Sequence, residues 1–482
     1  MLLVEPGRHV GGMLSGGLSR SDIERQERLV GGIAREVFER IGASYGEGGA
    51  AHWRFEPHVA EAVLRDLLGE AGVRLIEDAA LVDASLAGRG IASIGVEDGA
   101  RSGERISGAI WIDATYEGDL LAAAGASWTI GRESRELHGE RWAGRREILP
   151  NPHQARAPVP AGTDDGSLMP RVVAYDDIVP PGIGDGRIQS SCFRICLSRA
   201  EDRVSLAAPE DYDRSRYELV ERYLRSLVAN RLPLEMHDVL GISELPNGKA
   251  DVNSHGPFST NLLGAVEGYA TADRAGRARI VDEHRTWAAG LLHFLATDAA
   301  VPGEIAGLLA GYGYARDEFV DTNHWPHQLY VRDARRLVGE HVLVEGDLLG
   351  GRVPGDTIAM AGYNIDIREV QWVACPIPRF PDIADEVLVE GYLSVPVPPY
   401  GVPYRSLLPR RTQVENLLVS TCISASAVAF ASVRMEPTYL ALGHAAGVAA
   451  ARAARAGGAV HDVDVDQLRA DLAGAGQILS AG

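Results

Sequence analysis

The sequence predicts an α/β protein with two domains, and three observations support this prediction. First, the N-terminal third alternates a short apolar strand, a glycine-rich loop, helices and further strands, an order typical of a sheet covered by helices. Second, residues 140–190 change in character and are rich in Pro, Gly and Arg. Third, a strand, a loop of small residues and an Ala-rich helix follow residue 416. The first and last segments together predict one discontinuous domain.

The composition excludes several classes of protein. The 482 residues are 46% hydrophobic and 23% charged, which is enough apolar material for a sizeable core. The formal charge is −19 and no run of Lys or Arg occurs, so we expect no nucleic-acid partner, because such proteins need a cationic surface. The single lysine, Lys249, and the abundance of Arg, Ala and Gly are typical of a GC-rich bacterial genome.

The sequence also predicts a cytoplasmic protein without a membrane span. Residues 1–4 lead into Glu5 and Pro6 rather than into the long apolar region of a signal peptide. The longest apolar stretch, residues 417–433, is interrupted by Ser and Thr, which favours a buried strand and a loop. The four cysteines are too few and too scattered for a disulfide framework.

Periodicity and turn residues predict the elements of the first domain. Apolar residues recur at helical spacing over residues 23–41. Residues 57–71 form the clearest helix, because one apolar stripe runs along them, Pro57 suits the first turn and Gly72 suits the stop. Strands, with a small meander among them, are expected at residues 2–4, 73–76, 80–84, 91–96 and 109–112.

The second domain is expected at residues 136–403, after the first part of the first domain at residues 1–135. Its helices are predicted at residues 212–228, 262–298 and 327–342. The remaining part of the first domain is expected at residues 404–460, with a strand at 416–421 and a helix at 438–455. Residues 461–482 are expected to form a C-terminal tail.

The first motif with chemical meaning covers residues 3–17. A strand that ends in an acid, here Glu5, is typical of dinucleotide-binding folds, in which the carboxylate accepts hydrogen bonds from ribose hydroxyls. The glycines that follow allow backbone N–H groups to approach a flat ring or a phosphate. The candidate residues are Glu5, Gly7, Arg8, Gly11, Gly12, Met13, Ser15 and Gly16. Taken alone, the pattern also suits an ordinary strand that ends in an acidic turn.

The second motif covers residues 112–120 and follows another predicted strand. Its backbone is suited to bind the edge of an adenine ring. The candidate residues are Ala114, Thr115, Gly118 and Asp119. The alternative interpretation is a helix start in which Thr115 and Asp119 are caps.

The third motif covers residues 416–447. A buried strand ends in small residues, and a helix begins at Pro437, shortly after Arg434. The first N–H groups of this helix and the positive end of its dipole would face an anion. The candidate residues are Cys422, Ile423, Met435, Glu436, Pro437 and Thr438. The alternative is a core helix of an Ala-rich protein.

Together the three motifs resemble the FAD-dependent oxidoreductase family, which is distantly similar to the succinate dehydrogenase and fumarate reductase flavoproteins. Further matching stretches lie at residues 56–61, 189–199, 245–253, 324–332 and 363–366. The resemblance therefore covers most of the chain. It implies a Rossmann-like FAD-binding domain with a β-meander, and a second, α+β domain that covers the flavin and sets the substrate.

The resemblance also implies roles for the candidate residues. Glu5 would hold the FAD ribose, and residues 11–17 would run beside the ribityl chain and the isoalloxazine. Ala114 and Thr115 would lie near the adenine or the pyrophosphate. The flavin site would be completed by Cys422, Ile423 and Met435 to Thr438. Arg434 sits where the related flavoproteins place a substrate-binding arginine.

Two departures from the family pattern are visible. Family members open with a strand and a Gly-x-Gly-x-x-Gly-type loop ahead of the acid, whereas this sequence begins after that loop, so we expect an N-terminally incomplete FAD domain. A histidine often follows two residues after the aspartate at position 366, where this chain has Arg368. Heterodisulfide reductase flavin subunits, which are broader relatives, carry iron–sulfur clusters, but those need closely spaced cysteines that this sequence lacks.

The predicted activity is hydride transfer between a small organic substrate and flavin N5. A secondary alcohol or a sugar-like polyol is the substrate suggested by analogy. Arg434 is the candidate holder of a substrate anion or oxyanion. His324 and His327, at an expected helix start, are candidates for the general base. His255 and Asp366 are further candidates.

Two rival interpretations follow from the same residues. The chain is either a FAD enzyme, or a cofactor-deficient fragment or interaction module, because the Gly-x-Gly-x-x-Gly-type loop of the family is missing. A nicotinamide-dependent dehydrogenase is disfavoured, because the C-terminal strand, loop and helix suit a flavin ring better. The sequence carries no signal for the oligomeric state.

Overall fold

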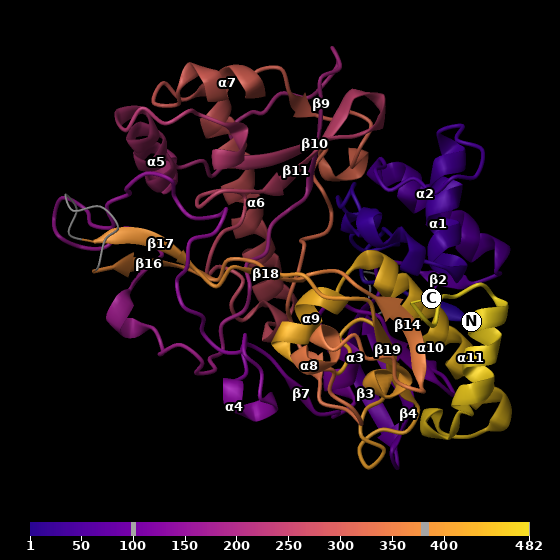
Figure 1. The fold of residues 1–482 in the computed structure, drawn as a ribbon. Helices are drawn as coiled ribbons and strands as arrows, with labels where there is room; N and C mark the ends of the chain where they lie inside the picture. The colour runs from indigo at the N-terminus through magenta and orange to yellow at the C-terminus, as the bar shows by residue number, and fades with distance from the viewer. Residues whose placement is uncertain (98–102, 377–384, 482) are drawn as a thin grey trace.

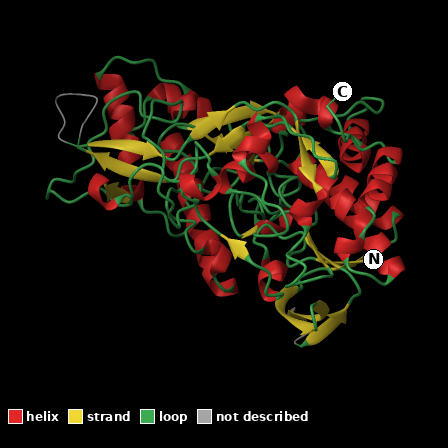
Figure 2. Ribbon diagram, turned by 60° about the horizontal axis from the view of Figure 1, so that its bottom comes forward, coloured by secondary structure: helices red, strands yellow, loops and turns green. Residues whose placement is uncertain are grey.

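The computed structural model describes residues 1–97, 103–376 and 385–481, and it has the α/β architecture that the sequence predicts. Both ends of the chain lie at one end of the molecule, and the antiparallel pair of β16 (Gln371–Cys375) and β17 (Glu386–Glu390) lies at the opposite end (Figure 1). Figure 2 shows helices between several small sheets rather than one continuous sheet.

Two parallel strand pairs belong to the part built by the first and last segments. β1 (Leu2–Val4) pairs with β2 (Arg74–Ile76). β6 (Trp111–Asp113) pairs with β20 (Leu417–Val419), so that strands far apart in sequence lie side by side. Because parallel strands end at the same edge of a sheet, the second and third motifs, which follow β6 and β20, are brought together.

Helices cover these strand pairs. α1 (Gly32–Ser44) and α2 (Pro57–Glu70) connect β1 to β2, and α2 has Pro57 in its first turn as predicted. α10 (Glu436–Ala456) packs against α1, and also against β14 (Thr357–Ala361) and α11 (Val465–Gly474). The small residues Ala445 and Ala449 of α10 are fully buried, which allows the close approach of its neighbours.

The expected meander is present as a three-stranded antiparallel sheet. Its strands are β3 (Ala80–Ala87), β4 (Gly90–Glu97) and β5 (Glu104–Ser107), in that order across the sheet. β5 was not predicted from the sequence.

The middle of the chain forms two further sheets with helices beside them. The four-stranded antiparallel sheet has the order β10-β11-β9-β12, with β9 (Ile195–Ser198), β10 (Leu240–Glu244), β11 (Lys249–Ser254) and β12 (Gly313–Tyr314). β8 (Val172–Ala174) joins β16 and β17 in a three-stranded sheet. The helices are α5 (Glu218–Ala229), α6 (Arg274–Thr297) and α7 (Gly303–Leu309). Ile195, Leu224 and Leu291, from β9, α5 and α6, share the largest apolar core.

Short elements complete the described part of the chain. The helices are α3 (Asp119–Ala123), α4 (Arg135–His138), α8 (Glu345–Leu349) and α9 (Ala427–Val433). The strands are β7 (Trp128–Thr129), β13 (Arg336–Leu337), β15 (Ile365–Ile367), β18 (Leu393–Val395) and β19 (Tyr400–Pro403). They form the antiparallel pairs β7–β13, β14–β19 and β15–β18.

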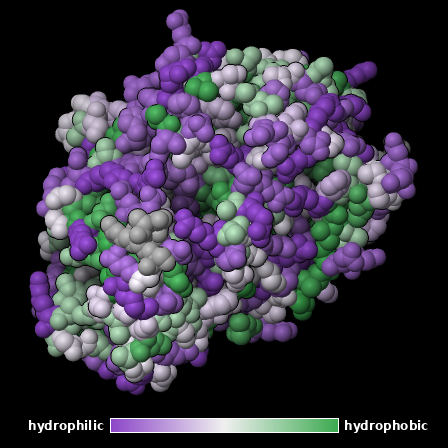
Figure 3. Space-filling view, turned by 180° about the vertical axis from the view of Figure 1, so that it is seen from behind, coloured by the Kyte–Doolittle hydropathy of each residue, from purple (hydrophilic) through white to green (hydrophobic). Residues whose placement is uncertain are grey.

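The surface shows hydrophobic side chains in separate patches among hydrophilic ones when the molecule is seen from behind (Figure 3). None of the helices in the described ranges combines the length and the apolar character that a membrane span requires.

Two predicted helices have different bounds in the structure. Residues 23–41 divide into a 3-10 segment, Asp22–Leu29, and α1, because Gly32 has a φ of +57° and its N–H donates to the Gly476 carbonyl at 2.9 Å. The helix expected at residues 262–298 begins only at Arg274, where the Asp273 carboxylate accepts the Gly276 N–H as an N-cap.

The prediction of a helix at residues 327–342 is wrong. The segment is extended or irregular and contains only the short strand β13. Its arginines are buried and reach partners far away in sequence: Arg332 donates to the Ser190 carbonyl at 2.8 Å, and Arg336 donates to Glu133 at 2.7 Å. These tertiary contacts outweigh the helical spacing of the apolar residues.

Candidate active site

Glu5 lies directly after β1, where the ribose ligand is expected. Its Oε1 accepts the Gly7 N–H at 2.9 Å. Burial raises the pKa of Glu5, the Gly7 hydrogen bond partly offsets this rise, and the charge of Glu117 adds to it. A half-buried carboxylate of this kind is suited to accept hydroxyl groups. Arg8 points elsewhere, since it forms an exposed ion pair with Asp78 at 3.0 Å.

The glycine-rich loop that follows is packed closely against other segments. A Cβ on Gly11 would lie 2.4 Å from a methyl of Leu64, and one on Gly16 would lie 2.3 Å from Cβ of Gln328. The φ of Gly11 is +106°, which side chains rarely adopt. The buried Ser15 hydroxyl donates to a carbonyl within the loop at 2.6 Å. Gln328 lies in residues 324–332, which follow α7. We call these residues the covering segment, because they pack on the loop at Gly16.

A tyrosine joins the loop to the start of α10. The Met13 N–H donates to the Tyr116 hydroxyl at 3.0 Å, and that hydroxyl donates to Glu436 Oε1 at 2.7 Å. Gly12 has a φ of +54°, and a Cβ there would lie 2.6 Å from the same hydroxyl. Burial raises the pKa of Glu436 to about 7, against the lowering effect of the Tyr116 hydrogen bond. The three motifs therefore meet in one network of contacts.

The second motif forms a helix start. Thr115 Oγ1 accepts the N–H groups of Gly118 at 2.9 Å and Asp119 at 3.0 Å, so it caps α3 as the alternative interpretation predicts. Thr115 is itself held by the buried Asp113, which accepts its N–H at 3.0 Å. Ala114 is exposed and remains available to a ligand.

Asp119 is an ion-pair residue as well as the first residue of α3. Its carboxylate accepts both terminal nitrogens of Arg277 at 2.6 Å and one nitrogen of Arg335 at 3.0 Å. Cys422 lies beside the same turn, and its thiol donates to the Thr115 carbonyl at 3.4 Å. Burial raises the pKa of Cys422 well above its usual value, so the group stays a thiol.

Arg434 lies between α9 and α10 and is almost completely buried. Its guanidinium donates to the Tyr330 hydroxyl at 3.0 Å, to the Asp366 carbonyl at 2.8 Å and to Gln189 Oε1 at 3.4 Å. Its Nε is buried and has no hydrogen-bond partner within the described ranges. Of the other residues of this motif, Ile423 is fully buried, Met435 is the N-cap of α10, and Pro437 and Thr438 lie in the first turn of that helix.

His324 does not start a helix. Its φ is +63°, and no helix follows it, which corrects the expectation for this residue pair. Its Nδ1 lies 3.2 Å from the Glu318 carbonyl oxygen, a contact that holds the turn. The left-handed backbone of His324 and of the preceding Asn323 explains why the helical pattern stops here.

His327 faces the glycine-rich loop. Its ring stacks on the ring of His9 with a centroid distance of 4.0 Å. Burial, and then the charge of His9, lower the pKa of His327 to about 4, so its imidazole is neutral at pH 7. Both ring nitrogens are buried without a hydrogen-bond partner in the part of the chain that the structure describes. Thus His327, unlike His324, has free donor and acceptor capacity beside the loop.

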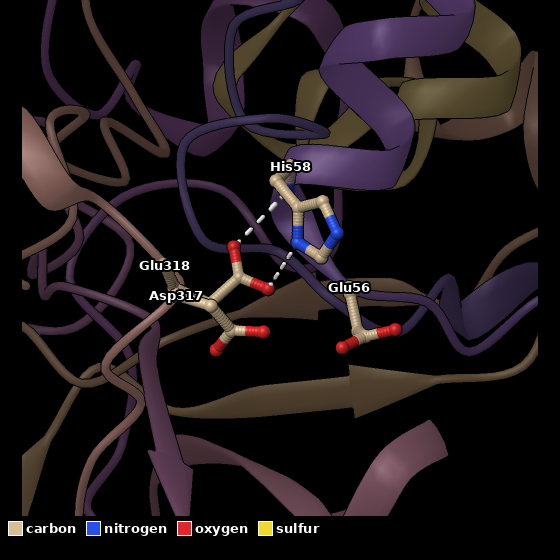
Figure 4. A group of neighbouring side chains, drawn as sticks. All are labelled: Glu56, His58, Asp317 and Glu318. Atoms are coloured by element: carbon tan, nitrogen blue, oxygen red, sulfur yellow. Dashed lines mark hydrogen bonds and ion pairs between the residues drawn. The ribbon is translucent and has the colours of Figure 1, made fainter. Parts of the chain in front are cut away.

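A cluster of carboxylates surrounds Lys249 near this region. Figure 4 shows that Glu56, His58, Asp317 and Glu318 face one another. Lys249 Nζ lies 2.6 Å from Glu56, 2.8 Å from Asp317 and 2.7 Å from Glu318. The ammonium group thus provides the cation that these carboxylates need, and it has three N–H donors for three acceptors.

The residues present fit a bound FAD. Arg434 Nε and both nitrogens of His327 are among the buried polar atoms that have no hydrogen-bond partner in the described ranges, and such atoms need a partner. Both side chains belong to the region where the covering segment meets the glycine-rich loop. Glu5, at the strand end, supplies an acceptor for ribose hydroxyls. A ligand whose polar atoms reached Arg434 Nε or the His327 ring would supply the missing hydrogen-bond partners.

Several residues of the site were not singled out from the sequence. Tyr116 lies inside the second motif, so the motif itself was the available signal. Gln189 and Tyr330 lie within stretches that match the family, and His9 lies inside the first motif. Their roles depend on long-range contacts, such as the stack of His9 on His327, that sequence spacing does not reveal.

Comparisons with known proteins identify the family. No curated protein matched the chain. The family described as FAD dependent oxidoreductase matches residues 1–472, which is nearly the whole sequence. Since the match includes all three motifs and the covering segment, the chain belongs to the FAD dependent oxidoreductase family.

Proposed function

We propose that this member of the family oxidises a small alcohol, a secondary alcohol or a sugar-like polyol, by hydride transfer. The observation that supports the proposal best is the contact of Tyr116 with both Met13 and Glu436, because it joins the loop to the start of α10. A flavin bound there supplies the hydride acceptor at N5.

The cofactor is proposed to lie along the three motifs. Glu5 accepts the ribose hydroxyls, and the loop from Gly11 to Gly16 runs beside the ribityl chain and the ring. Ala114 and Thr115 lie near the adenine or pyrophosphate, with Gly118 and Asp119 behind them. The isoalloxazine end is formed by Cys422, Ile423, Met435, Glu436, Pro437 and Thr438. The N-terminal dipole of α10 favours negative charge at this end.

The substrate side is proposed to be built by residues 136–403 as a covering domain, between the two parts of the FAD domain at 1–135 and 404–460. Arg434 holds the substrate oxygen through its guanidinium. His327 takes the hydroxyl proton, because its imidazole is neutral and its nitrogens have no protein partner in the described chain. His324 holds the turn, and Asp366 orients Arg434 through its carbonyl.

Anaerobic flavin reduction tests this function. We expect FAD-loaded protein to lose its visible flavin absorbance when a secondary alcohol or polyol is added without oxygen. The matched ketones serve as controls and should leave the flavin oxidised. The proposal is wrong if dithionite bleaches the bound flavin but no compound in a panel of alcohols and polyols does.

A further inference from the structure

A cavity of about 180 Å³ lies beside β10 and β11 of the four-stranded sheet, and residues of both strands line it. Its volume corresponds to about six water molecules, using ~30 Å³ each. That is room for one small polar group rather than for a whole cofactor. The residues that matter here are Arg20, Arg194, Arg368, His237, His255 and Asn253.

The walls of this cavity are basic. Three arginines and two histidines line it, and none of its lining residues within the described ranges is an Asp or a Glu. Arg194 is held from behind by a forked ion pair with Asp251, and Arg368 lies 3.2 Å from Glu369. The carboxylates thus fix the guanidinium groups without facing the cavity.

Two further observations concern the charged and polar groups at the cavity. Burial lowers the pKa of His255, and the charges of His153, His237 and Arg368 add to this effect against a hydrogen bond to the His237 carbonyl. Arg368 Nε is buried and lacks a hydrogen-bond partner in the described chain. An unsatisfied buried guanidinium N–H is a donor for an oxyanion.

The cavity is connected to the proposed reaction site through one glutamine. Gln189 Oε1 accepts the Arg368 backbone N–H at 3.2 Å and the Arg434 guanidinium at 3.4 Å. On the other side, a Cβ on Gly17 would lie 2.3 Å from the carbonyl oxygen of Arg194. The basic cavity therefore adjoins both the glycine-rich loop and the arginine proposed to hold the reacting oxygen.

We propose that this cavity binds an anionic group of the substrate, a carboxylate or a phosphate ester, and so restricts the substrate to alcohols that carry such a group. The inference rests on the proposed function only for the identity of the ligand as substrate. Anion binding itself depends on Arg20, Arg194 and Arg368 and requires no redox chemistry.

A cavity-filling variant provides the sharpest test. A Cβ on Gly241 would lie 3.5 Å from Cβ of His255 and 3.8 Å from Cβ of Asn253, both of which line the cavity. Gly241→Leu therefore fills the space and leaves every charge in place. Gly69→Leu is the matched control, because Gly69 is helical, exposed and has nothing within 4 Å of its Cβ position.

The probes are inorganic phosphate and malonate, titrated by calorimetry at constant ionic strength. We expect saturable binding at one site per chain, at least tenfold weaker in Gly241→Leu and in Arg368→Gln and unchanged in Gly69→Leu. Should Arg368→Gln fail to fold, Gly241→Leu decides. Binding that is not saturable, or that is equal in all folded variants, overturns the inference.

The rate of flavin reduction by different alcohols distinguishes a failure of the anion site from a failure of the proposed function. An alcohol with a carboxylate should reduce the flavin faster than the same alcohol without it, and Gly241→Leu should remove this difference. If phosphate binds in the cavity but no alcohol reduces the flavin, the anion site stands and the proposed function falls. If alcohols reduce the flavin irrespective of charge and phosphate does not compete, the inference falls.

Discussion

Two residues of the candidate site are buried and have unused hydrogen-bonding capacity. Arg434 and His327 each keep a buried nitrogen without a partner in the described chain. Such groups lower stability unless a ligand completes them. We therefore propose that both residues serve function, and substitutions can separate this role from a structural one.

Arg434→Lys should keep the charge and lose the planar fork. We expect the rate of flavin reduction to fall about 10²-fold, as for the loss of one well-placed oxyanion donor. Bound flavin should stay near the wild-type level. Arg352→Lys is the control, because Arg352 is exposed and pairs only with Asp347 among the contacts described for it. Loss of flavin together with the fold would assign Arg434 to structure instead.

His327→Ala should slow flavin reduction by ~10²–10⁴-fold, the usual contribution of a general base. Since the pKa of His327 is about 4, the wild-type rate should change little with pH between 6 and 8. His324→Asn is the matched control, because Asn tolerates the positive φ of that turn. Stopped-flow reduction across pH measures both variants. Wild-type rates in His327→Ala would move the base to another residue, such as Asp366 or His255.

Among the helices and strands, the start of α10 gives the clearest expectation for how stability depends on pH. Glu436 lies in its first turn and is buried with a raised pKa of about 7. A carboxyl group that is protonated in the fold but ionised when unfolded loses stability as pH rises above its usual value of 4.5. The loss is complete once pH has passed the folded pKa.

Glu436→Gln should keep the acceptor for Tyr116 and remove this pH dependence. We expect nearly equal unfolding free energies at pH 4 and an advantage on the order of 3 kcal/mol for the variant at pH 8. Denaturant unfolding at several pH values measures the difference. Glu39→Gln, on the partly exposed surface of α1, should show no such trend. A difference that is independent of pH would mean that Glu436 is ionised in the fold.

Some helices and strands could be predicted from the sequence, and others could not. The stripe and caps of α2, and the strand, loop and helix at the C-terminus, were predictable because local pattern and burial agree. The segment at 327–342 was not, since its buried arginines bind the distant Ser190 and Glu133. The candidate motifs were found from residue type and spacing. The contacts through which Tyr116 connects the motifs could not be predicted, and neither could the basic cavity. Both bring together strands and loops that are remote in sequence.

At the scale of the whole molecule, Lys249 ties distant segments together. Its ammonium group joins the start of α2, through Glu56, to the 317–318 segment. Burial opposes its charge, but Glu318, Asp317 and Glu56 outweigh this and raise the pKa of Lys249. A buried cation with several carboxylates stabilises only while all partners are present.

Lys249→Met should lower the free energy of unfolding by about 3–5 kcal/mol, because it leaves the buried Glu56 and Glu318 without their cation. Arg352→Met removes an exposed ion pair and should cost only about 0–1 kcal/mol. Denaturant midpoints at pH 7 compare the two. A loss in Lys249→Met no larger than in the control would show that the cluster contributes nothing to joining these segments.

We propose that FAD lies along the three motifs, with its ribose on Glu5. Titration of the purified chain with FAD, followed by quenching of flavin fluorescence, tests it most directly. We predict one FAD per chain, and about tenfold weaker binding in Glu5→Ala, as expected for the loss of one charge-assisted hydrogen bond. Glu39→Ala should bind as the wild type does. Absence of saturable FAD binding, or equal affinity in Glu5→Ala, would contradict the account.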